Sequence, residues 1–321
     1  MSALRRLGVA VDPRTSEEST PAQHQTEQAF GYKWSRVESY GSPAMVAFSR
    51  EWLLRKYCDG DEGVLDGWLA GSRKLILDAG CGSGYSATCL FGERLRDHDY
   101  LGVDISNAVD VARDAFHHLG LPGDFIQCDL NAIPIPDGQV DLILAEGSLH
   151  HTDDTGAAIS ALARKLTPGG RFLFYVYSQK APLREFADDL IRRELDGLSD
   201  EEAWQRLVPL TRLGVALGEL DATIDVPEDI PYLGISAGKV PLQELIYYAA
   251  LKAFYRSDWS FDEMHHVNFD WYRPTNARRH TEDEVRRYVE AAGLLIDRFY
   301  SEQSGYSVVA RATRSASERS A

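Results

Sequence analysis

The sequence predicts an α/β protein built on a mostly parallel β-sheet with helices on both faces. Short apolar segments typical of buried strands alternate with helix-like segments over residues 74–178, and further strand-like segments follow within residues 271–312. A glycine-rich loop follows the first predicted strand, and acidic residues follow later ones. Ligands of such sheets bind at the carboxyl ends of the strands, so we expect a binding site there.

The elements of the first part of this core are predicted in a regular order. Apolar runs rich in branched and aromatic residues predict the strands Lys74–Ala79, Tyr100–Val103, Asp124–Cys128, Val140–Ala145 and Arg171–Tyr177. Helical periodicity between them predicts helices over Tyr85–Arg96, Ala108–Leu119 and Thr155–Leu166.

The second part of the core is predicted over residues 271–312. Thr281 and Glu284 have the spacing of a capping box, which predicts a helix over Glu282–Gly293. A pair of strands then follows over 294–301 and 306–312.

The segments outside the core have a different character. Residues 1–24 and 313–321 are polar with little apolar content, so we expect two disordered tails. Residues 25–73 contain two helix-like segments. Residues 179–270 are mainly helical by pattern and contain twice as many acidic as basic residues, so we expect an inserted helical cap. Four prolines interrupt this pattern: Pro209, Pro227, Pro231 and Pro241.

The loop after the first strand has the sequence Asp78-x-Gly80-x-Gly82-x-Gly84. Glycine at alternate positions permits left-handed backbone and close approach of a ligand, and the N-terminus of the following helix favours a negative group. Tyr85 occupies the position where the dinucleotide-binding pattern has its third glycine. This departure argues against a site for NAD or FAD.

With this loop and the acids that follow strands two, three and four, the chain resembles the class I S-adenosylmethionine-dependent methyltransferases of the small-molecule type. The resemblance implies a Rossmann-like seven-stranded sheet, mostly parallel with an antiparallel last strand, and S-adenosyl-L-methionine as the cofactor. It also implies that the cofactor-binding residues are Asp78, Gly80, Cys81, Gly82, Gly84, Asp104, Ile105, Asp129, Leu130 and Glu146.

Three acids of this set have specific expected contacts. Asp104 lies about 20 residues beyond the glycine loop, which suits a bidentate hydrogen bond to ribose hydroxyls. By resemblance, Asp129 accepts a hydrogen bond from the adenine amine while Leu130 offers its backbone N–H, and Glu146 contacts the ammonium of the cofactor. The structural alternatives are a helix cap for Asp104 and a turn for Asp129.

The aromatic cluster at residues 30–34 precedes the first strand. In many methyltransferases of this kind, helices ahead of the first strand cover the cofactor, so the resemblance implies a helical lid over residues 25–73, with Tyr32 and Trp34 as cofactor contacts. Alternatively, these aromatic side chains only pack the helices onto the core.

Candidate catalytic residues lie after strand four, at the end of strand five and at the junction of cap and core. His150 and His151 follow strand four, where either imidazole could hold or deprotonate a substrate nucleophile. Tyr175 could form an aromatic wall for a sulfonium, and Asp270 and Tyr272 lie in a segment dense in polar and aromatic residues. The two histidines are adjacent in a loop rather than four apart on a helix, so no metal site is predicted.

The composition excludes several classes of partner. A formal net charge of −15 at pH 7 argues against nucleic acid and anionic membranes as partners. The four cysteines show neither a metal-binding nor a secreted-domain spacing, and no apolar run is long enough to span a membrane, so we expect a cytoplasmic protein with reduced thiols. We expect a monomer or homodimer with a small-molecule substrate.

The sequence therefore predicts a small-molecule methyltransferase, acting by in-line methyl transfer, of the kind found in specialised metabolism. Two alternatives keep the cofactor: an enzyme that performs a non-methyl or intramolecular displacement at the sulfonium, such as cyclisation or aminobutyryl transfer, and a protein that binds the cofactor without turnover. A methyl-transferring protein must align nucleophile, methyl and sulfur, because the cofactor supplies most of the reactivity.

Overall fold

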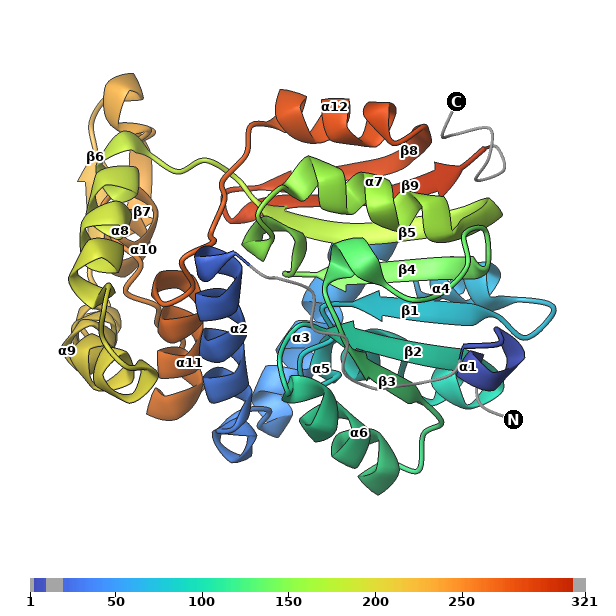
Figure 1. Ribbon diagram of the computed structural model, residues 1–321. Coiled ribbons are helices and arrows are strands. Elements are labelled where there is room, and N and C mark those ends of the chain that lie inside the picture. The colour runs from blue at the N-terminus through green and yellow to red at the C-terminus, as the bar shows by residue number, and fades with distance from the viewer. Residues whose placement is uncertain (1–2, 10–19, 314–321) are drawn as a thin grey trace.

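The computed structural model describes residues 3–9 and 20–313. A seven-stranded mixed sheet forms its centre, helices cover both faces of the sheet, and a helical cap stands beyond one end of the strands (Figure 1). The arrows of the central strands point towards the cap, so the cap faces the carboxyl ends of the parallel strands (Figure 1). The α/β fold expected from the sequence is confirmed.

The sheet has the strand order β3-β2-β1-β4-β5-β9-β8. The first five strands pair in parallel, and β9 is antiparallel to both of its neighbours, as expected for the last strand. The chain order reverses beside β1, where a doubly wound sheet leaves a crevice for ligands. The strands are β1 (Leu75–Ala79), β2 (Asp99–Asp104), β3 (Asp124–Gln127), β4 (Val140–Glu146), β5 (Leu166–Tyr177), β8 (Leu294–Glu302) and β9 (Gly305–Ala312).

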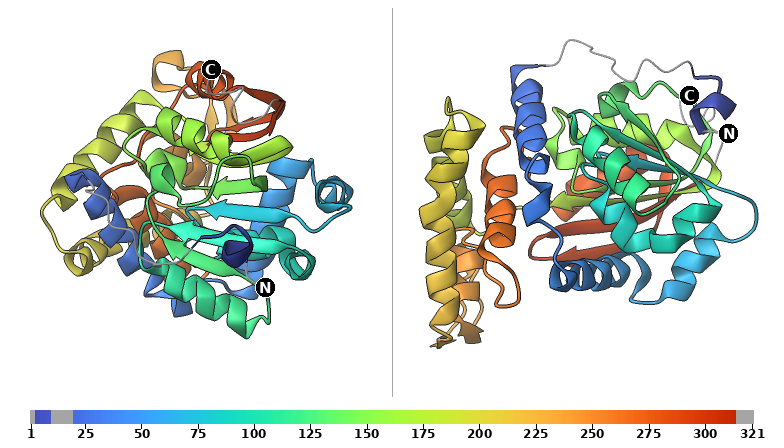
Figure 2. Two further views of the ribbon diagram at one scale, coloured as in Figure 1. Left: turned by 45° about the vertical axis from the view of Figure 1, so that its right-hand side comes forward. Right: turned by 90° about the horizontal axis from the view of Figure 1, so that it is seen from below.

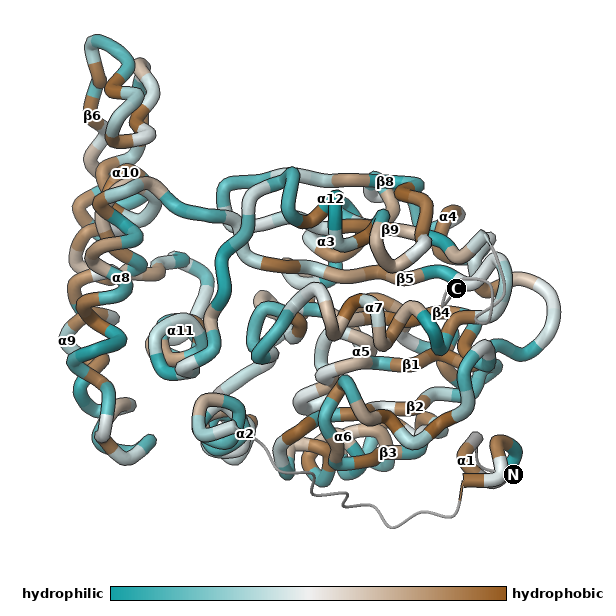
Figure 3. Tube along the Cα trace, turned by 45° about the horizontal axis from the view of Figure 1, so that its top comes forward, coloured by the Kyte–Doolittle hydropathy of each residue, from teal (hydrophilic) through white to brown (hydrophobic). Residues whose placement is uncertain are grey.

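Successive residues of the central strands pack against opposite layers of helices. Leu77 of β1 belongs to the core that includes α7 and α12, whereas Ile76 belongs to the core that includes α3, α4, α5 and α6. Figure 3 shows hydrophobic residues, in brown, along the central strands and a mixture of hydrophobic and hydrophilic residues along the helices. The helices of the two layers are α3 (Pro43–Cys58), α4 (Glu62–Leu69), α5 (Tyr85–Phe91), α6 (Ala108–His118), α7 (Thr155–Lys165) and α12 (Glu282–Ala291).

Helix boundaries follow local signals. The capping box of α12 is confirmed: the Thr281 hydroxyl accepts from the Glu284 N–H, and the Glu284 carboxylate accepts from the Thr281 N–H at 2.8 Å. The helix predicted over residues 85–96 ends at Phe91, because Gly92 has a φ of +56°, and the chain continues as a 3₁₀ helix over Gly92–Asp97.

The cap is an insertion between β5 and α12. Its helices are α8 (Pro182–Leu195), α9 (Asp200–Glu219), α10 (Leu242–Ala249) and α11 (Phe261–Tyr272). Since α11 contains residues on both sides of the expected domain boundary at 270/271, the boundary falls inside a helix. Helix α11 packs against α9 on one side and against α2 (Pro21–Trp34) on the other, so the cap contacts the N-terminal part of the chain (Figure 2).

Two features of the cap differ from the sequence pattern. Helix α9 continues through Pro209, because its face with Trp204 and Leu207 is buried, and this burial offsets the roughly 3 kcal/mol that an interior proline costs. The cap also contains an antiparallel hairpin, β6 (Thr223–Val226) and β7 (Gly238–Pro241), where a helical pattern was expected.

The expected N-terminal tail is wrong for its described residues. Residues 3–6 form the short helix α1 (Ala3–Arg6), Leu4 is buried in the core, and its N–H donates to Asp124 at 3.1 Å. Helix α2 begins at Pro21 with Thr20 as its N-cap. Residues 10–19 of the first tail and residues 314–321 of the second lie outside the described residues.

Over the residues that the structure describes, no helix combines the length and the apolar character needed to cross a membrane.

Candidate functional site

A cavity of about 470 Å³ lies at the carboxyl ends of the parallel strands, between the sheet and the cap. Its wall joins the loop after β1, the ends of β2, β4 and β5, helices α2 and α3, and the cap. Of the predicted site residues, the wall contains Trp34, Gly80, Cys81, Gly82, Asp104, Ile105, Asp129, Leu130, Glu146, His151, Tyr175 and Asp270. These residues are thus brought together from segments spread over more than 200 positions of the chain.

The glycine loop forms a close-fitting floor for this cavity. Gly80 and Gly82 have φ values of +83° and +50°, and a Cβ at Gly82 would lie 2.7 Å from Nε1 of Trp34. The Val103 carbonyl at the end of β2 accepts from the N–H groups of Gly80 and Cys81 at 2.7 and 2.9 Å. The second strand therefore fixes the loop through backbone hydrogen bonds, and only glycine fits its turns.

Asp104 connects this loop to the second strand. Its carboxylate accepts from the Gly82 N–H at 2.9 Å and from the Ser106 N–H and hydroxyl at 2.9 and 2.7 Å. Burial raises the pKa of Asp104, and the hydrogen bonds from Ser106 and Gly82 oppose that rise. The carboxylate lines the cavity and has lone pairs left for a ligand donor.

The Asp129 side chain makes a local hydrogen bond and also lines the cavity. Its side chain accepts from the Asn131 N–H at 2.7 Å and caps the 3₁₀ helix Leu130–Ala132, a local role close to the turn considered as the structural alternative for this residue. It also lines the cavity beside Leu130. This hydrogen bond to the start of the 3₁₀ helix fixes the Asp129 carboxylate at the end of the third strand.

Glu146 already has two partners from helix α3. The buried Lys56 ammonium pairs with its Oε1, and the Tyr57 hydroxyl donates to its Oε2 at 2.5 Å. The Lys56 ammonium also lies 3.4 Å from the centroid of Trp52 and 4.3 Å from that of Tyr175. Burial lowers the pKa of Lys56, and the Glu146 carboxylate opposes this. The fourth-strand acid is thus enclosed by a cation and aromatic rings from α3.

The two histidines after β4 have different environments. His151 lines the cavity, its Nδ1 donates to the Asn276 carbonyl at 2.5 Å, and its Nε2 has no hydrogen-bond partner among the described residues. The hydrogen bond to a carbonyl fixes the proton on Nδ1, so Nε2 carries the free lone pair. Burial lowers the pKa of His151 to about 4, which keeps the imidazole neutral at pH 7.

Asp270 of α11 reaches the cavity from the cap side. It accepts from the Lys33 ammonium of α2 at 2.6 Å and from the Tyr177 hydroxyl at 3.3 Å. Burial by itself would raise the pKa of Asp270, but the nearby positive charges, above all Lys33, outweigh it and lower the pKa to about 2. The carboxylate is therefore ionised and ties the cap to the N-terminal helix.

Five predicted site residues do not line the cavity. His150 is fully buried, with its ring centroid 3.6 Å from that of Tyr177, and Tyr32 donates outward to Glu201 at 2.5 Å. The Tyr272 hydroxyl donates to Asp188 within the cap at 2.9 Å. The expectation that these side chains contact a bound ligand is therefore corrected.

The other two belong to the loop but support it from behind. Gly84 has a φ of +77° and begins α5, where a Cβ would lie 2.8 Å from the Phe116 ring. Asp78 is buried and accepts from the Tyr100 hydroxyl at 2.7 Å, and burial raises its pKa to about 7. Both positions shape the loop rather than the cavity.

The sequence analysis missed many charged and aromatic residues of the wall, most of which come from α2, α3 and the cap. Lys33 lies within the aromatic cluster at residues 30–34 and Lys56 lies within α3. Each has its acidic partner far along the chain, so sequence spacing gives no signal of the pairs. The missed wall residues are Lys33, Tyr40, Phe48, Trp52, Tyr85, Tyr247, Tyr248, Lys252, Phe254 and Trp259, together with Lys56 and Tyr57 beside the wall.

Comparison with known proteins gives one family match. Residues 77–174 match the model of the family described as "Methyltransferase domain". These residues contain the glycine loop, all three strand-end acids and both adjacent histidines.

Two curated relatives match over a similar part of the chain. One is the ubiquinone/menaquinone biosynthesis C-methyltransferase UbiE of Pseudoalteromonas translucida (strain TAC 125), 33% identical over 108 residues, which are 32% of this chain and 43% of the relative. The other is the fatty-acid O-methyltransferase of Mycolicibacterium smegmatis (strain ATCC 700084 / mc(2)155), 33% identical over 102 residues, which are 32% of this chain and 36% of the relative. The chain thus matches less than half the length of either relative.

A solved structure, the magnesium protoporphyrin IX methyltransferase from Synechocystis PCC 6803 with bound S-adenosylmethionine, superposes with a TM-score of 0.46 at 15% sequence identity. That superposition covers 92% of this chain and 100% of the other.

Proposed function

Because the chain belongs to the class I S-adenosylmethionine-dependent methyltransferase family, we propose that it transfers the methyl group of S-adenosylmethionine to a small molecule. The proposal covers the whole protein, whereas the family match covers residues 77–174. The observation that carries it is a single cavity containing both the glycine loop and a neutral imidazole whose Nε2 has no partner in the described chain.

The cavity floor fits this cofactor. Side chains at Gly80 and Gly82 would meet the residues opposite, so the loop offers backbone without Cβ atoms to a ligand. The carboxylates of Asp104 and Asp129 stand at the ends of neighbouring strands, where they can accept hydrogen bonds from ribose and adenine, respectively. Bound S-adenosylmethionine supplies an electrophilic methyl group on a positively charged sulfur.

The aromatic wall and the imidazole provide the rest of the arrangement. The rings of Trp52 and Tyr175 lie beside the Lys56 ammonium, which supports a role for this aromatic wall beside a positive charge. His151 holds its proton on Nδ1 and offers Nε2 to a substrate hydroxyl or amine, so it can accept the proton that the nucleophile loses. The cap closes the cavity on the substrate side and excludes water from the reacting atoms.

We extend the proposal to substrate class and location. A cap of about 90 residues lined with aromatic side chains supports a small molecule of specialised metabolism rather than a macromolecule as substrate. The four cysteines are all buried and none of them forms a disulfide within the described residues, which is consistent with reduced thiols and supports a cytoplasmic location. A monomer or homodimer is proposed as the oligomeric state.

The test is mass spectrometry of products formed by the purified chain with methyl-labelled S-adenosylmethionine, alone and with a panel of small acceptors. S-adenosylhomocysteine formed only with an acceptor, together with a labelled product, is the expected result. Methylthioadenosine formed without an acceptor would instead support the intramolecular or non-methyl displacement. Binding of the cofactor without turnover of any acceptor in the panel would contradict the proposed enzymatic activity and support the non-catalytic alternative.

A further inference from the structure

We propose that Lys252 binds an acidic group of the substrate, so that the substrate is an aromatic molecule that carries a carboxylate or a similar anion. This inference rests on the proposed function, because it assigns the substrate side of the same cavity. Lys252 lies in the segment between α10 and α11, is 7% exposed, and lines the cavity.

Lys252 differs from the other lysines near the cavity in its lack of an anionic partner. Lys33 pairs with Asp270 at 2.6 Å, and Lys56 pairs with Glu146. Within residues 3–9 and 20–313, no hydrogen bond or ion pair is found for the Lys252 ammonium, which lies over the Trp271 ring at 4.7 Å from its centroid. A buried ammonium without an anion is unfavourable because it has lost its hydration, and a bound anion would compensate for that loss.

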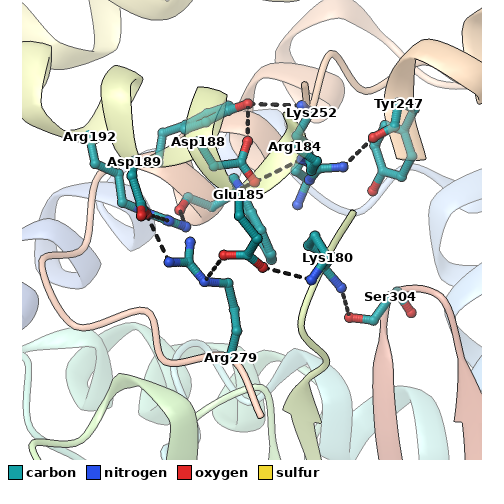
Figure 4. Close-up of polar contacts among 12 residues, drawn as sticks. Lys180, Arg184, Glu185, Asp188, Asp189, Arg192, Tyr247, Lys252, Arg279 and Ser304 are labelled. Carbon is teal, nitrogen blue, oxygen red and sulfur yellow. Dashed lines mark hydrogen bonds and ion pairs between the residues drawn. The ribbon is translucent and has the colours of Figure 1, made fainter. Parts of the chain in front are cut away.

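The polar network of the cap does not supply this anion. Asp188 is the buried carboxylate of α8, and it accepts from the Arg184 guanidinium at 2.7 Å (Figure 4). It also accepts from the Trp271 indole N–H at 2.8 Å and from the Tyr272 hydroxyl at 2.9 Å. Burial lowers the pKa of Lys252 to about 7; Asp270 and Asp188 oppose this change and Arg184 adds to it. An anion beside the ammonium would stabilise its charged form.

The backbone around Lys252 is held in place on both sides. The Lys252 N–H donates to the Tyr272 hydroxyl at 2.9 Å, and the Phe254 N–H donates to the Asn268 side chain at 3.1 Å. The Gln243 amide donates to the Ala253 carbonyl at 2.9 Å. Three hydrogen bonds within three residues therefore preorganise the segment, which is the property expected of a residue that orients a ligand.

The wall around this ammonium defines the rest of the ligand. Aromatic side chains from β5, from α10 and from the segment before α11 share the cavity with it, and such rings favour a flat apolar body. These side chains are Tyr175, Tyr177, Tyr247, Tyr248, Phe254 and Trp259. An unpaired cation within an aromatic wall recognises an aromatic acid better than its neutral analogue.

The experiment compares 2-naphthoate with 2-naphthamide, which have the same ring system but differ in charge. Binding of each to the full chain saturated with S-adenosylhomocysteine is measured by calorimetry at pH 6.5. We expect the acid to bind about tenfold or more tightly than the amide, since a charge-assisted hydrogen bond contributes about 1.5–3 kcal/mol. In Lys252→Met this preference should vanish, with the affinity for the amide unchanged, and Lys252→Arg should restore part of it.

Lys239→Met is the matched control, because Lys239 is an exposed lysine on the cap hairpin. It should retain the preference for the acid. Equal affinities for acid and amide in the wild-type chain, persistence of the preference in Lys252→Met, or absence of binding of both probes at millimolar concentration would each overturn the inference. The proposed function fails separately, because it would be contradicted by loss of S-adenosylhomocysteine binding or of labelled methyl transfer in the wild-type chain.

Discussion

The cofactor side and the substrate side of the cavity are built by different means. The glycine loop and the acids beside it lie at consecutive strand ends, and backbone hydrogen bonds from Val103 fix the loop. The substrate side is assembled from α2, the end of β5, the segment before α11 and α11 itself, and side-chain pairs such as Lys33–Asp270 join these elements. One side is therefore set by sheet topology, and the other by packing between distant segments.

The largest expected effect is on the cofactor side of the cavity, for the substitution Gly80→Ala. Gly80 has a φ of +83°, and a Cβ there would overlap the Ser148 side chain, so the loop must move. Affinity for S-adenosylhomocysteine, measured by calorimetry, should fall by more than about 100-fold, because a rearranged loop loses contacts worth at least about 2.7 kcal/mol.

Gly71→Ala is the matched control for this change. Gly71 has a φ of +87°, but a Cβ there would meet nothing within 4 Å. It should lose about 1 kcal/mol of stability through backbone strain and keep its cofactor affinity. Equal loss of affinity in both variants would show that general strain, and not the shape of the cavity floor, determines binding.

The next effect tests the residue at which the two sides meet. In His151→Gln, the free imidazole nitrogen is replaced by an amide that cannot accept a proton at neutral pH. We expect kcat for methyl transfer to fall by about 100-fold or more, while the affinity for S-adenosylhomocysteine, measured in parallel, stays within about twofold. A parallel loss of both quantities would place His151 in cofactor binding instead.

This division explains what could be predicted from the sequence. The loop, Asp104 and Asp129 follow strands whose order is regular, so their convergence at one sheet edge follows from the parallel pairing. Lys33 and Asp270 are separated by 237 positions, and their pairing depends on how α2 packs on α11. Local periodicity carries no information about such packing, which is why the cap was predicted as a helical insertion with Asp270 and Tyr272 as candidates, but without the partners of Asp270.

The misplaced residues follow the same logic. Tyr32 was expected at the cofactor because it lies beside Trp34, but neighbouring residues on a helix point in different directions, and Tyr32 donates to Glu201 of the cap instead. Tyr272 lies two positions beyond Asp270 on α11, and its side chain faces Asp188 rather than the cavity. Closeness in sequence within a helix therefore does not show that two side chains belong to the same site.

A smaller effect, on stability, is expected when the Lys33–Asp270 ion pair is broken by the substitution Asp270→Asn. The change leaves the Lys33 ammonium, 7% exposed as a residue, without its carboxylate. Because the Asp270 side chain is about a quarter exposed, we expect a loss of only about 2 kcal/mol in the free energy of unfolding, measured by urea titration. Asp262→Asn, on the first turn of the same helix, is the control and should change stability by less than about 0.5 kcal/mol; an equal loss in both would refute a specific role for the pair.

The smallest expected effect is a difference in acid sensitivity between the cap and the core. Burial lowers the pKa of His265 to about 4, and this residue is held between the Thr211 hydroxyl and the Trp204 carbonyl. Its pKa in the unfolded chain is about 6.5, so between pH 6.5 and 4 the unfolded state binds more protons and stability falls as the pH falls. Asp78 in the core has the opposite dependence, because burial raises its pKa to about 7, and its contribution to stability is lost as the pH rises towards 7.

The contribution of His265 to this pH dependence of stability can be measured by thermal unfolding at pH 7.5 and pH 5. The wild-type midpoint should fall at pH 5, since His265 must then be held neutral against its unfolded pKa. In His265→Gln, which keeps hydrogen-bonding capacity without the titration, this fall should be smaller by a few degrees. His117→Gln on α6 removes an exposed histidine and should leave the fall unchanged. If His265→Gln and His117→Gln both showed the same fall in midpoint as the wild type, the acid sensitivity would not arise from burial of His265 in the cap. The proposed difference in pH dependence between cap and core would then be contradicted.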